Sequence, residues 1–119
     1  MPHPFGYMQL ATADVDKAQQ FYGGLFDWQL ESTGDAEHPY IEIQSGDGPP
    51  IGGMMPAAPQ APPMWVPYIQ VATVDGFVTQ ARDLGATVAQ EPTELPDHSW
   101  YAVLIDPTGA PFALHGPRS

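Results

Sequence analysis

The sequence predicts an α+β fold built from two β-α-β-β-β modules in one domain. Strand-like and helix-like segments occur in the same order in both halves of the 119 residues. The halves also resemble each other, because Tyr7–Thr12 (YMQLAT) matches Tyr68–Thr73 (YIQVAT) at a shift of 61 residues. A proline-rich connector over residues 56–64 separates them. We therefore expect one domain, 1–119, with module one at about 5–55 and module two at about 65–116.

The first half is expected to begin with a strand over Phe5 to Ala11, whose side chains alternate between two largely uncharged faces. Thr12 or Asp14 can cap the helix that follows. Apolar side chains recur at helical spacing in this helix and need a sheet to cover them; they are Ala18, Phe21, Tyr22, Leu25 and Phe26. Three short strands follow, separated by turns rich in Gly, Asp and Pro, at Trp28 to Ser32, Tyr40 to Gln44 and Ile51 to Met55.

The second half repeats this order. Trp65 to Val71 is predicted as a strand, and Asp75 to Leu84 as a helix that Gly85 ends. Three more strands are expected at Thr87 to Gln90, Trp100 to Ile105 and Phe112 to His115. The sequence Asp106-Pro107-Thr108-Gly109 is typical of a turn and joins the last two strands.

Composition excludes several classes of function. The chain has three basic and fourteen acidic residues, so its net charge is −11. This charge disfavours nucleic acid and anionic membranes as partners. No apolar run reaches the roughly 20 residues that span a bilayer, and no secretion signal is recognisable, so a cytoplasmic location is expected. With no cysteine, disulfides, thiolate nucleophiles and cysteine-ligated metal sites are excluded.

Three segments resemble the vicinal oxygen chelate superfamily, the glyoxalase/bleomycin resistance/dioxygenase proteins. Residues 13–28 (ADVDKAQQFYGGLFDW) resemble its first helix, and residues 74–86 and 106–112 resemble its second-half motifs. The resemblance implies that the two modules form a curved, cup-like mixed sheet with the helices outside. It also implies a small-molecule ligand in the cup and a homodimer. Whether modules pair within one chain or across a dimer stays open.

Metal-dependent members of this superfamily place His or Glu on the first and last strand of each module. The positions that match them here hold Tyr7, Gly52 or Met54, Val66 or Tyr68, and Ala113. None is a His or a carboxylate, and a neutral phenol, which titrates near 10, is a poor ligand. We therefore expect no metal and no other cofactor, although a metal site at other residues remains an alternative.

With the strands oriented as in the superfamily, the resemblance implies ligand-binding residues in the cup at Tyr7, Gln9, Met54, Tyr68, Gln70 and His115. Trp100 is a further ligand-binding candidate, because its ring could stack on a planar ligand. The two glutamines are the most informative of these residues about a ligand. A buried amide without a hydrogen-bond partner costs about 1–3 kcal/mol of folding free energy. Each amide therefore bonds either a ligand or, in the alternative interpretation, a neighbour within a filled cup.

Two residues are candidates for proton transfer. His115 is expected near the rim of the cup, and imidazole exchanges protons near neutral pH. Glu42 alternates with Ile41 and Ile43, so its side chain should point away from the side that the helix covers. The alternatives are an exposed histidine at a strand end and a carboxylate that faces solvent.

Two functions follow as hypotheses. The first is a metal-independent protein that binds a small aromatic or amphiphilic molecule. The alternative is a glyoxalase-like enzyme, acting as a lyase, isomerase or dioxygenase, with or without a divalent metal. The residues do not decide between enzyme and binder, and an accessory dimer with a filled cup is a further possibility.

Overall fold

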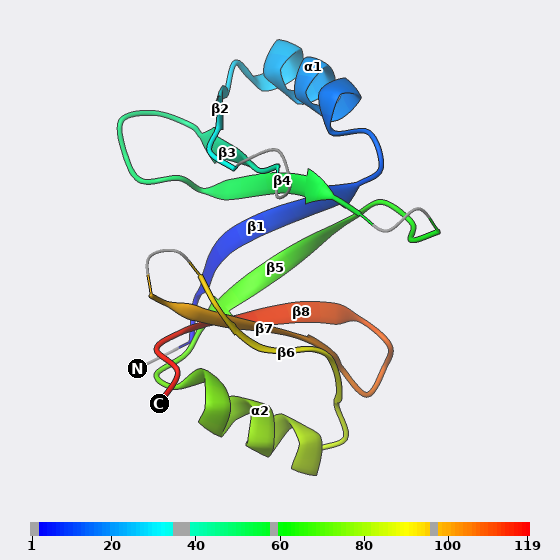
Figure 1. Cartoon of the computed structure of the whole chain (residues 1–119), viewed down its shortest axis with the longest axis vertical. Coiled ribbons are helices and arrows are strands. Elements are labelled where there is room, and N and C mark those ends of the chain that lie inside the picture. The colour runs from blue at the N-terminus through cyan, green and yellow to red at the C-terminus, as the bar shows by residue number, and fades with distance from the viewer. Residues whose placement is uncertain (1–2, 35–38, 58–59, 96–97) are drawn as a thin grey trace. The chain divides into compact units, whose positions relative to one another are not determined.

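The computed structural model describes residues 3–34, 39–57, 60–95 and 98–119 (Figure 1). The chain divides into two compact units. The first unit is Tyr7–Val66, and the second consists of Pro67–Ser119 together with the residues up to Gly6. The expected α+β class is confirmed, because both halves of the chain run β-α-β-β-β.

The bounds of most elements agree with the sequence within one or two residues. The first half contains β1 (Phe5–Thr12), α1 (Val15–Phe26), β2 (Gln29–Ser32), β3 (Ile41–Gln44) and β4 (Gly52–Pro56). The second half contains β5 (Met64–Gln70), α2 (Val74–Asp83), β6 (Thr87–Glu94), β7 (Trp100–Ile105) and β8 (Pro111–Gly116).

Two segments differ from the prediction. Strand β6 continues four residues beyond the expected end at Gln90, through two shifts in its register with β7. The connector is shorter than 56–64, because Pro56 ends β4 and Met64 begins β5. Its residues 58 and 59 lie outside the described part of the chain.

Helix α1 begins at a side-chain cap. The Asp14 carboxylate accepts a hydrogen bond from the Lys17 backbone N–H at 2.9 Å, so Asp14 is the capping residue of the two candidates. The helix ends at Asp27, which adopts the left-handed conformation with φ 60°. Its backbone N–H donates to the Gly23 carbonyl.

The sheet of the first unit has the strand order β2-β3-β4-β1. Strands β1 and β4 are parallel and the other neighbours are antiparallel, so the sheet is mixed, as expected. Helix α1 packs on one face, over a core of Leu10, Ile41, Ile43 and Met54. Tyr7 and Gln9 alternate with Met8 and Leu10 along β1 and therefore lie on the opposite face, here called the helix-free face.

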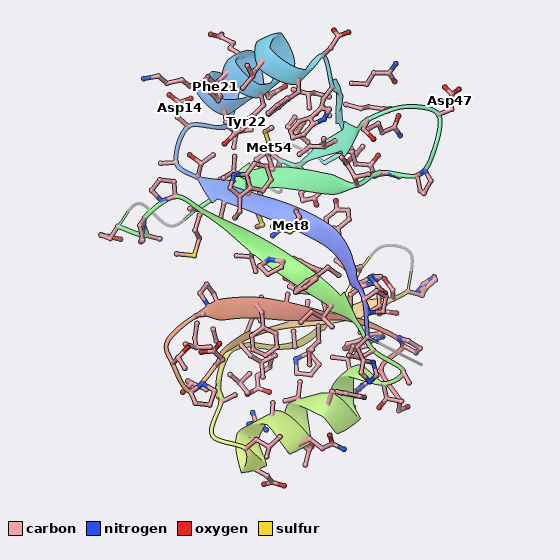
Figure 2. All side chains as sticks on the ribbon, turned by 180° about the vertical axis from the view of Figure 1, so that it is seen from behind. Met8, Asp14, Phe21, Tyr22, Asp47 and Met54 are labelled. Carbon is pink, nitrogen blue, oxygen red and sulfur yellow. The ribbon has the colours of Figure 1, made fainter. Side chains whose placement is uncertain are left out.

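Only part of the apolar stripe of α1 covers the sheet. Ala18 and Tyr22 pack against the core. Phe21, Leu25 and Phe26 are 59%, 58% and 53% exposed, so the expectation that the whole stripe is buried is wrong for these three. Figure 2 shows Phe21 and Tyr22 on α1, with Met54 on the strand below.

The sheet of the second unit has the order β5-β8-β7-β6, with β5 and β8 parallel. Helix α2 covers a core of Val71, Val74, Val78, Ala102, Leu104 and Leu114. The strand alternation places Tyr68, Gln70, Tyr101, Ala113 and His115 on the helix-free face of this unit. Within the described residues, neither helix is long and apolar enough to cross a membrane.

Candidate functional site

The helix-free face of the first unit carries a hydrogen-bonded group of two phenols and an amide. The hydroxyls of Tyr7 and Tyr40 lie 2.5 Å apart, and the Tyr40 hydroxyl donates to Gln9 Oε1 at 3.3 Å. Gln9 Nε2 in turn donates to the Met55 sulfur at 2.7 Å. The Gln9 amide is therefore held by neighbours on both of its ends.

A glycine makes room for this group. Gly53 lies opposite Gln9 in the parallel pairing and opposite Glu42 in the antiparallel one. A Cβ at Gly53 would overlap the hydroxyl and ring of Tyr40. The absent side chain thus allows Tyr40 to lie across β4 and reach β1. The Gly52-Gly53 pair is the signal in the sequence for this close approach.

The environment raises the pKa of Tyr7 above that of a free phenol. Burial is the main cause, the hydrogen bond with Tyr40 lowers the pKa in part, and the negative charge of Glu42 raises it further. Tyr7 is therefore a neutral hydrogen-bonding phenol at neutral pH. Glu42 points away from the buried Ile41 and Ile43, which confirms its predicted orientation.

The helix-free face of the second unit holds His115 between two polar side chains. His115 Nδ1 lies 3.0 Å from Gln70 Oε1, and its Nε2 lies 2.9 Å from the Ser99 hydroxyl. Gln70 itself lies over Gly6, where a Cβ would come within 2.5 Å of its Nε2. The imidazole is thus held at both nitrogens, which fixes the orientation of its ring.

An aromatic pair lies on the same face. Tyr68 and Tyr101 stack with ring centroids 6.2 Å apart, and Tyr68 is 5% exposed. Sequence reasoning named Tyr68 but missed Tyr101. The signal was present, because Tyr101 alternates with Ala102, which lies in the core under α2.

Two of the predicted ligand-binding residues lie on the other faces. Met54 is fully buried in the core under α1, because the parallel register pairs it with Leu10. The expectation that Met54 shares a face with Gln9 is therefore wrong, and Met55 takes that place. Trp100 packs against the core under α2, with the Arg118 guanidinium 4.8 Å above its ring. Trp100 thus lies on the face opposite to Tyr101, and its role in stacking on a ligand stays a prediction.

The donors on these faces do not fit the metal site of the superfamily. Tyr7 is a neutral phenol, Gly53 and Ala113 provide no donor, and Tyr68 is nearly buried. Among the residues that the structure describes, no three His, Asp or Glu side chains are grouped so that they could hold an ion. A divalent cation needs several imidazole or carboxylate ligands. No reaction step through a metal follows from these residues.

The comparisons with known proteins agree with this architecture. Methylmalonyl-CoA epimerase in complex with methylmalonyl-CoA and NH₄⁺ aligns with a TM-score of 0.70 and 17% identity over 98% of this chain and 96% of that one. The methylmalonyl-CoA epimerase of Mycobacterium tuberculosis aligns with a TM-score of 0.64 and 15% identity, over 95% of this chain and 87% of that one. The repeated β-α-β-β-β units thus define a protein of the vicinal oxygen chelate class. The chain belongs to the glyoxalase-like domain family of that superfamily, whose sequence pattern matches residues 7–115.

Curated relatives extend beyond this chain. The putative glyoxylase CFP32 of Mycobacterium tuberculosis is 33% identical over 112 residues, which are 92% of this chain and 42% of the relative. The anthracycline biosynthesis protein DnrV of Streptomyces peucetius is 29% identical over 117 residues, 96% of this chain and 42% of the relative. The chain spans about two fifths of the length of these relatives.

Proposed function

We propose that the helix-free face of each unit, taken by itself, binds a small aromatic or amphiphilic molecule, without a metal ion. The observation that carries this proposal is the combination of aromatic rings and hydrogen-bonding groups on each face. Tyr7, Tyr40 and Gln9 provide it in the first unit, and Gln70, His115 and Tyr101 in the second. Small-molecule sites typically combine apolar surface with a few polar groups that fix orientation.

The polar groups favour a ligand that carries hydroxyl or carbonyl groups. Phenol, amide and imidazole side chains can each donate or accept a hydrogen bond. The Glu42 carboxylate near Tyr7 and the net charge of −11 disfavour an anionic ligand. We therefore expect a neutral, ring-containing molecule with a few oxygen atoms.

Two further observations support the proposal. The donor set described above does not fit a divalent cation, which favours binding without a metal. Two relatives are named for anthracycline biosynthesis, which favours a small organic ligand over a macromolecule.

The test is calorimetric titration with 1,8-dihydroxyanthraquinone, a neutral aromatic probe with hydroxyl and carbonyl groups. We expect saturable binding. Gln9→Ala should weaken it about tenfold at the face of the first unit, and Gln70→Ala should do so at the face of the second unit, since one lost hydrogen bond contributes about 1.4 kcal/mol. Gln80→Ala, an exposed amide on α2, is the matched control and should bind as the parent does. Equal weakening by all three variants, or by none, would contradict the placement of the ligand.

The metal-free part of the proposal has its own measurement. Protein purified without chelator should contain no stoichiometric metal, and added Ni²⁺, Zn²⁺, Mn²⁺ or Fe²⁺ should leave its melting temperature unchanged. An ion that binds the native state raises that temperature by mass action. A selective rise with one of these ions would overturn the metal-free proposal.

One observation favours the enzymatic alternative. Gln70 and Ser99 hold His115 at both ring nitrogens. A residue that transfers a proton in catalysis needs such a fixed position relative to its substrate. If the chain is an enzyme, His115→Gln should abolish turnover of a substrate while its affinity persists. Glu42→Gln tests the second candidate in the same way, and a variant that loses affinity as well as turnover would indicate a binding role.

A further inference from the structure

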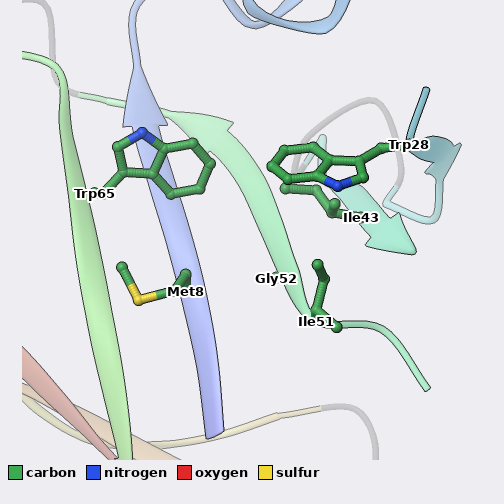
Figure 3. A pocket seen from close by; sticks show the side chains of 6 residues that line it. All are labelled: Met8, Trp28, Ile43, Ile51, Gly52 and Trp65. Carbon is green, nitrogen blue, oxygen red and sulfur yellow. The ribbon is translucent and has the colours of Figure 1, made fainter. Parts of the chain in front are cut away.

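The first unit contains a pocket on the face that carries α1 (Figure 3). This face of β1 is buried at Leu10, which is 5% exposed, but open at Met8, which is 38% exposed. The pocket lies at this open end and has a volume of about 360 Å³. Its lining consists of Met8, Trp28, Ile43, Ile51, Gly52 and Trp65. None of the side chains named in the proposed function lines it.

Three strands form the floor of the pocket. Met8 on β1 pairs with Gly52 on β4, and Gly52 pairs with Ile43 on β3. Gly52 has no side chain, and a Cβ at this position would overlap the Met8 carbonyl oxygen. Glycine is therefore required here by the close strand pairing, and the missing side chain leaves the floor hollow.

Two indoles stand on opposite sides of the pocket, as Figure 3 shows. Trp65 donates its ring N–H to the Tyr22 hydroxyl at 3.2 Å and meets the Tyr22 ring edge-on, with centroids 5.4 Å apart. Trp28 stacks on Tyr22 at 5.9 Å and packs against Phe26 at 4.9 Å. Contacts outside the pocket thus hold both walls in place before any ligand arrives.

The lining determines the chemistry of the occupant. No charged side chain lines the pocket, and the N–H of Trp65 is already used by Tyr22. A charged ligand would lose its hydration here without gaining a charged partner from the lining. Flat aromatic rings, in contrast, gain from contact with two indoles. The volume is at the lower end of the range of about 300–1,000 Å³ for small-molecule sites.

We infer that this pocket is a second binding site, for a neutral apolar aromatic molecule of about one to three fused rings. The molecule lies between Trp28 and Trp65 over Gly52. This site is separate from the helix-free face and does not depend on the function proposed for that face.

The probe for the test is N-phenyl-1-naphthylamine, a neutral aromatic amine whose fluorescence rises in apolar surroundings. We expect one saturable site per chain, with quenching of tryptophan emission. Ile51→Glu places a carboxylate on the pocket lining at a residue that is 42% exposed, and should weaken binding about tenfold or more. Leu84→Glu makes the same change at a residue that is 78% exposed and outside the pocket, and should bind as the parent does.

A second control separates the pocket from the exposed side of α1. Phe21→Glu changes the exposed apolar stripe of the helix and should leave binding of the probe unchanged. Gln9→Ala and Gln70→Ala should also leave binding of this probe unchanged, although they weaken binding on the helix-free faces. Equal losses in Phe21→Glu and Ile51→Glu, or no loss in Ile51→Glu, would overturn the inference.

A measurement on the unaltered protein covers the case in which Ile51→Glu fails to fold. In ¹H–¹⁵N spectra, naphthalene should shift the indole N–H signals of Trp28 and Trp65 and leave that of Trp100 in place. Shifts at all three indoles, or at none, would overturn the inference. Sedimentation provides one more outcome that would overturn the inference. In that outcome the parent is a dimer whose pocket does not bind the probe, and Ile51→Glu is a monomer.

Discussion

Gln70 Oε1 and His115 Nδ1 lie 3.0 Å apart, across the parallel pairing of β5 and β8. A carbonyl oxygen accepts but cannot donate, so the Nδ1 of the imidazole must carry the proton of this bond. In the neutral ring, Nε2 is then an acceptor and receives the Ser99 hydroxyl proton at 2.9 Å. The two side chains therefore select the less common tautomer of histidine and leave its basic nitrogen toward Ser99.

This tautomer is directly measurable. Long-range ¹H–¹⁵N spectra at pH 8 should show the Nδ1–H form of His115, and Gln70→Ala should shift the ring toward the Nε2–H form because the acceptor at Nδ1 is lost. His98, which contacts Glu94 at an exposed position, serves as the internal control and should not change. An Nε2–H tautomer in the parent would contradict the assigned hydrogen bond.

The raised pKa of Tyr7 makes stability depend on pH in the alkaline range. A group with a raised pKa in the folded state binds more protons folded than unfolded, so its contribution is complete below the unfolded value near 10 and is lost as pH rises through the folded value. We expect the free energy of unfolding to fall more steeply above pH 10 in the parent than in Tyr7→Phe. Urea unfolding between pH 8 and 11 measures this difference, with Tyr22→Phe as control.

The burial of Met54 predicts a large loss of stability on truncation. Met54→Ala leaves a cavity in the core under α1 and should lower the free energy of unfolding by about 2–5 kcal/mol. Met55→Ala should cost clearly less, because Met55 lies on the opposite face and contacts Gln9 there. Urea unfolding of both variants checks the assignment, and the reverse order would place the wrong methionine in the core.

Gly53 and Tyr40 should be energetically coupled. Gly53→Ala introduces a Cβ that overlaps the Tyr40 ring, and we expect a loss of about 1–3 kcal/mol as the ring is displaced. In the Tyr40→Ala background the same change should cost little, since the ring is absent. A double-mutant cycle by urea unfolding measures the coupling, and additive effects would contradict the packing of Tyr40 over Gly53.

The elements of the fold could be predicted because their signals are local. Asp14 caps α1 through a hydrogen bond three residues along the chain. Asp106 closes the predicted turn by accepting from the Thr108 and Ala110 backbone N–H groups at 2.8 and 3.1 Å. Neither contact needs any knowledge of the tertiary structure. The repeated order of strands and helices was therefore readable from the sequence.

The site was less predictable because it depends on register. A slip of one residue moves a strand's side chains to the other face, and Met54 and Met55 are identical in type, so the pattern could not choose between them. The adjacent aromatic residues Trp100 and Tyr101 presented the same ambiguity. Gln9, Gln70 and His115 lie on the helix-free faces, where the strand orientation implied by the resemblance places them, and their role there stays a prediction.

The N-terminal residues of the chain belong to its second unit. The Pro4 carbonyl accepts from the Gln70 backbone N–H at 2.9 Å, and His3 contacts the Phe77 ring with centroids 4.9 Å apart. A single cut in the connector would therefore not yield two self-sufficient halves, because the fragment with α2 would lack its N-terminal arm. Circular permutation that joins residue 119 to residue 3 would keep that arm with the unit it completes. The connector between the two halves of the sequence and the boundaries of the two compact units thus lie at different places in the chain.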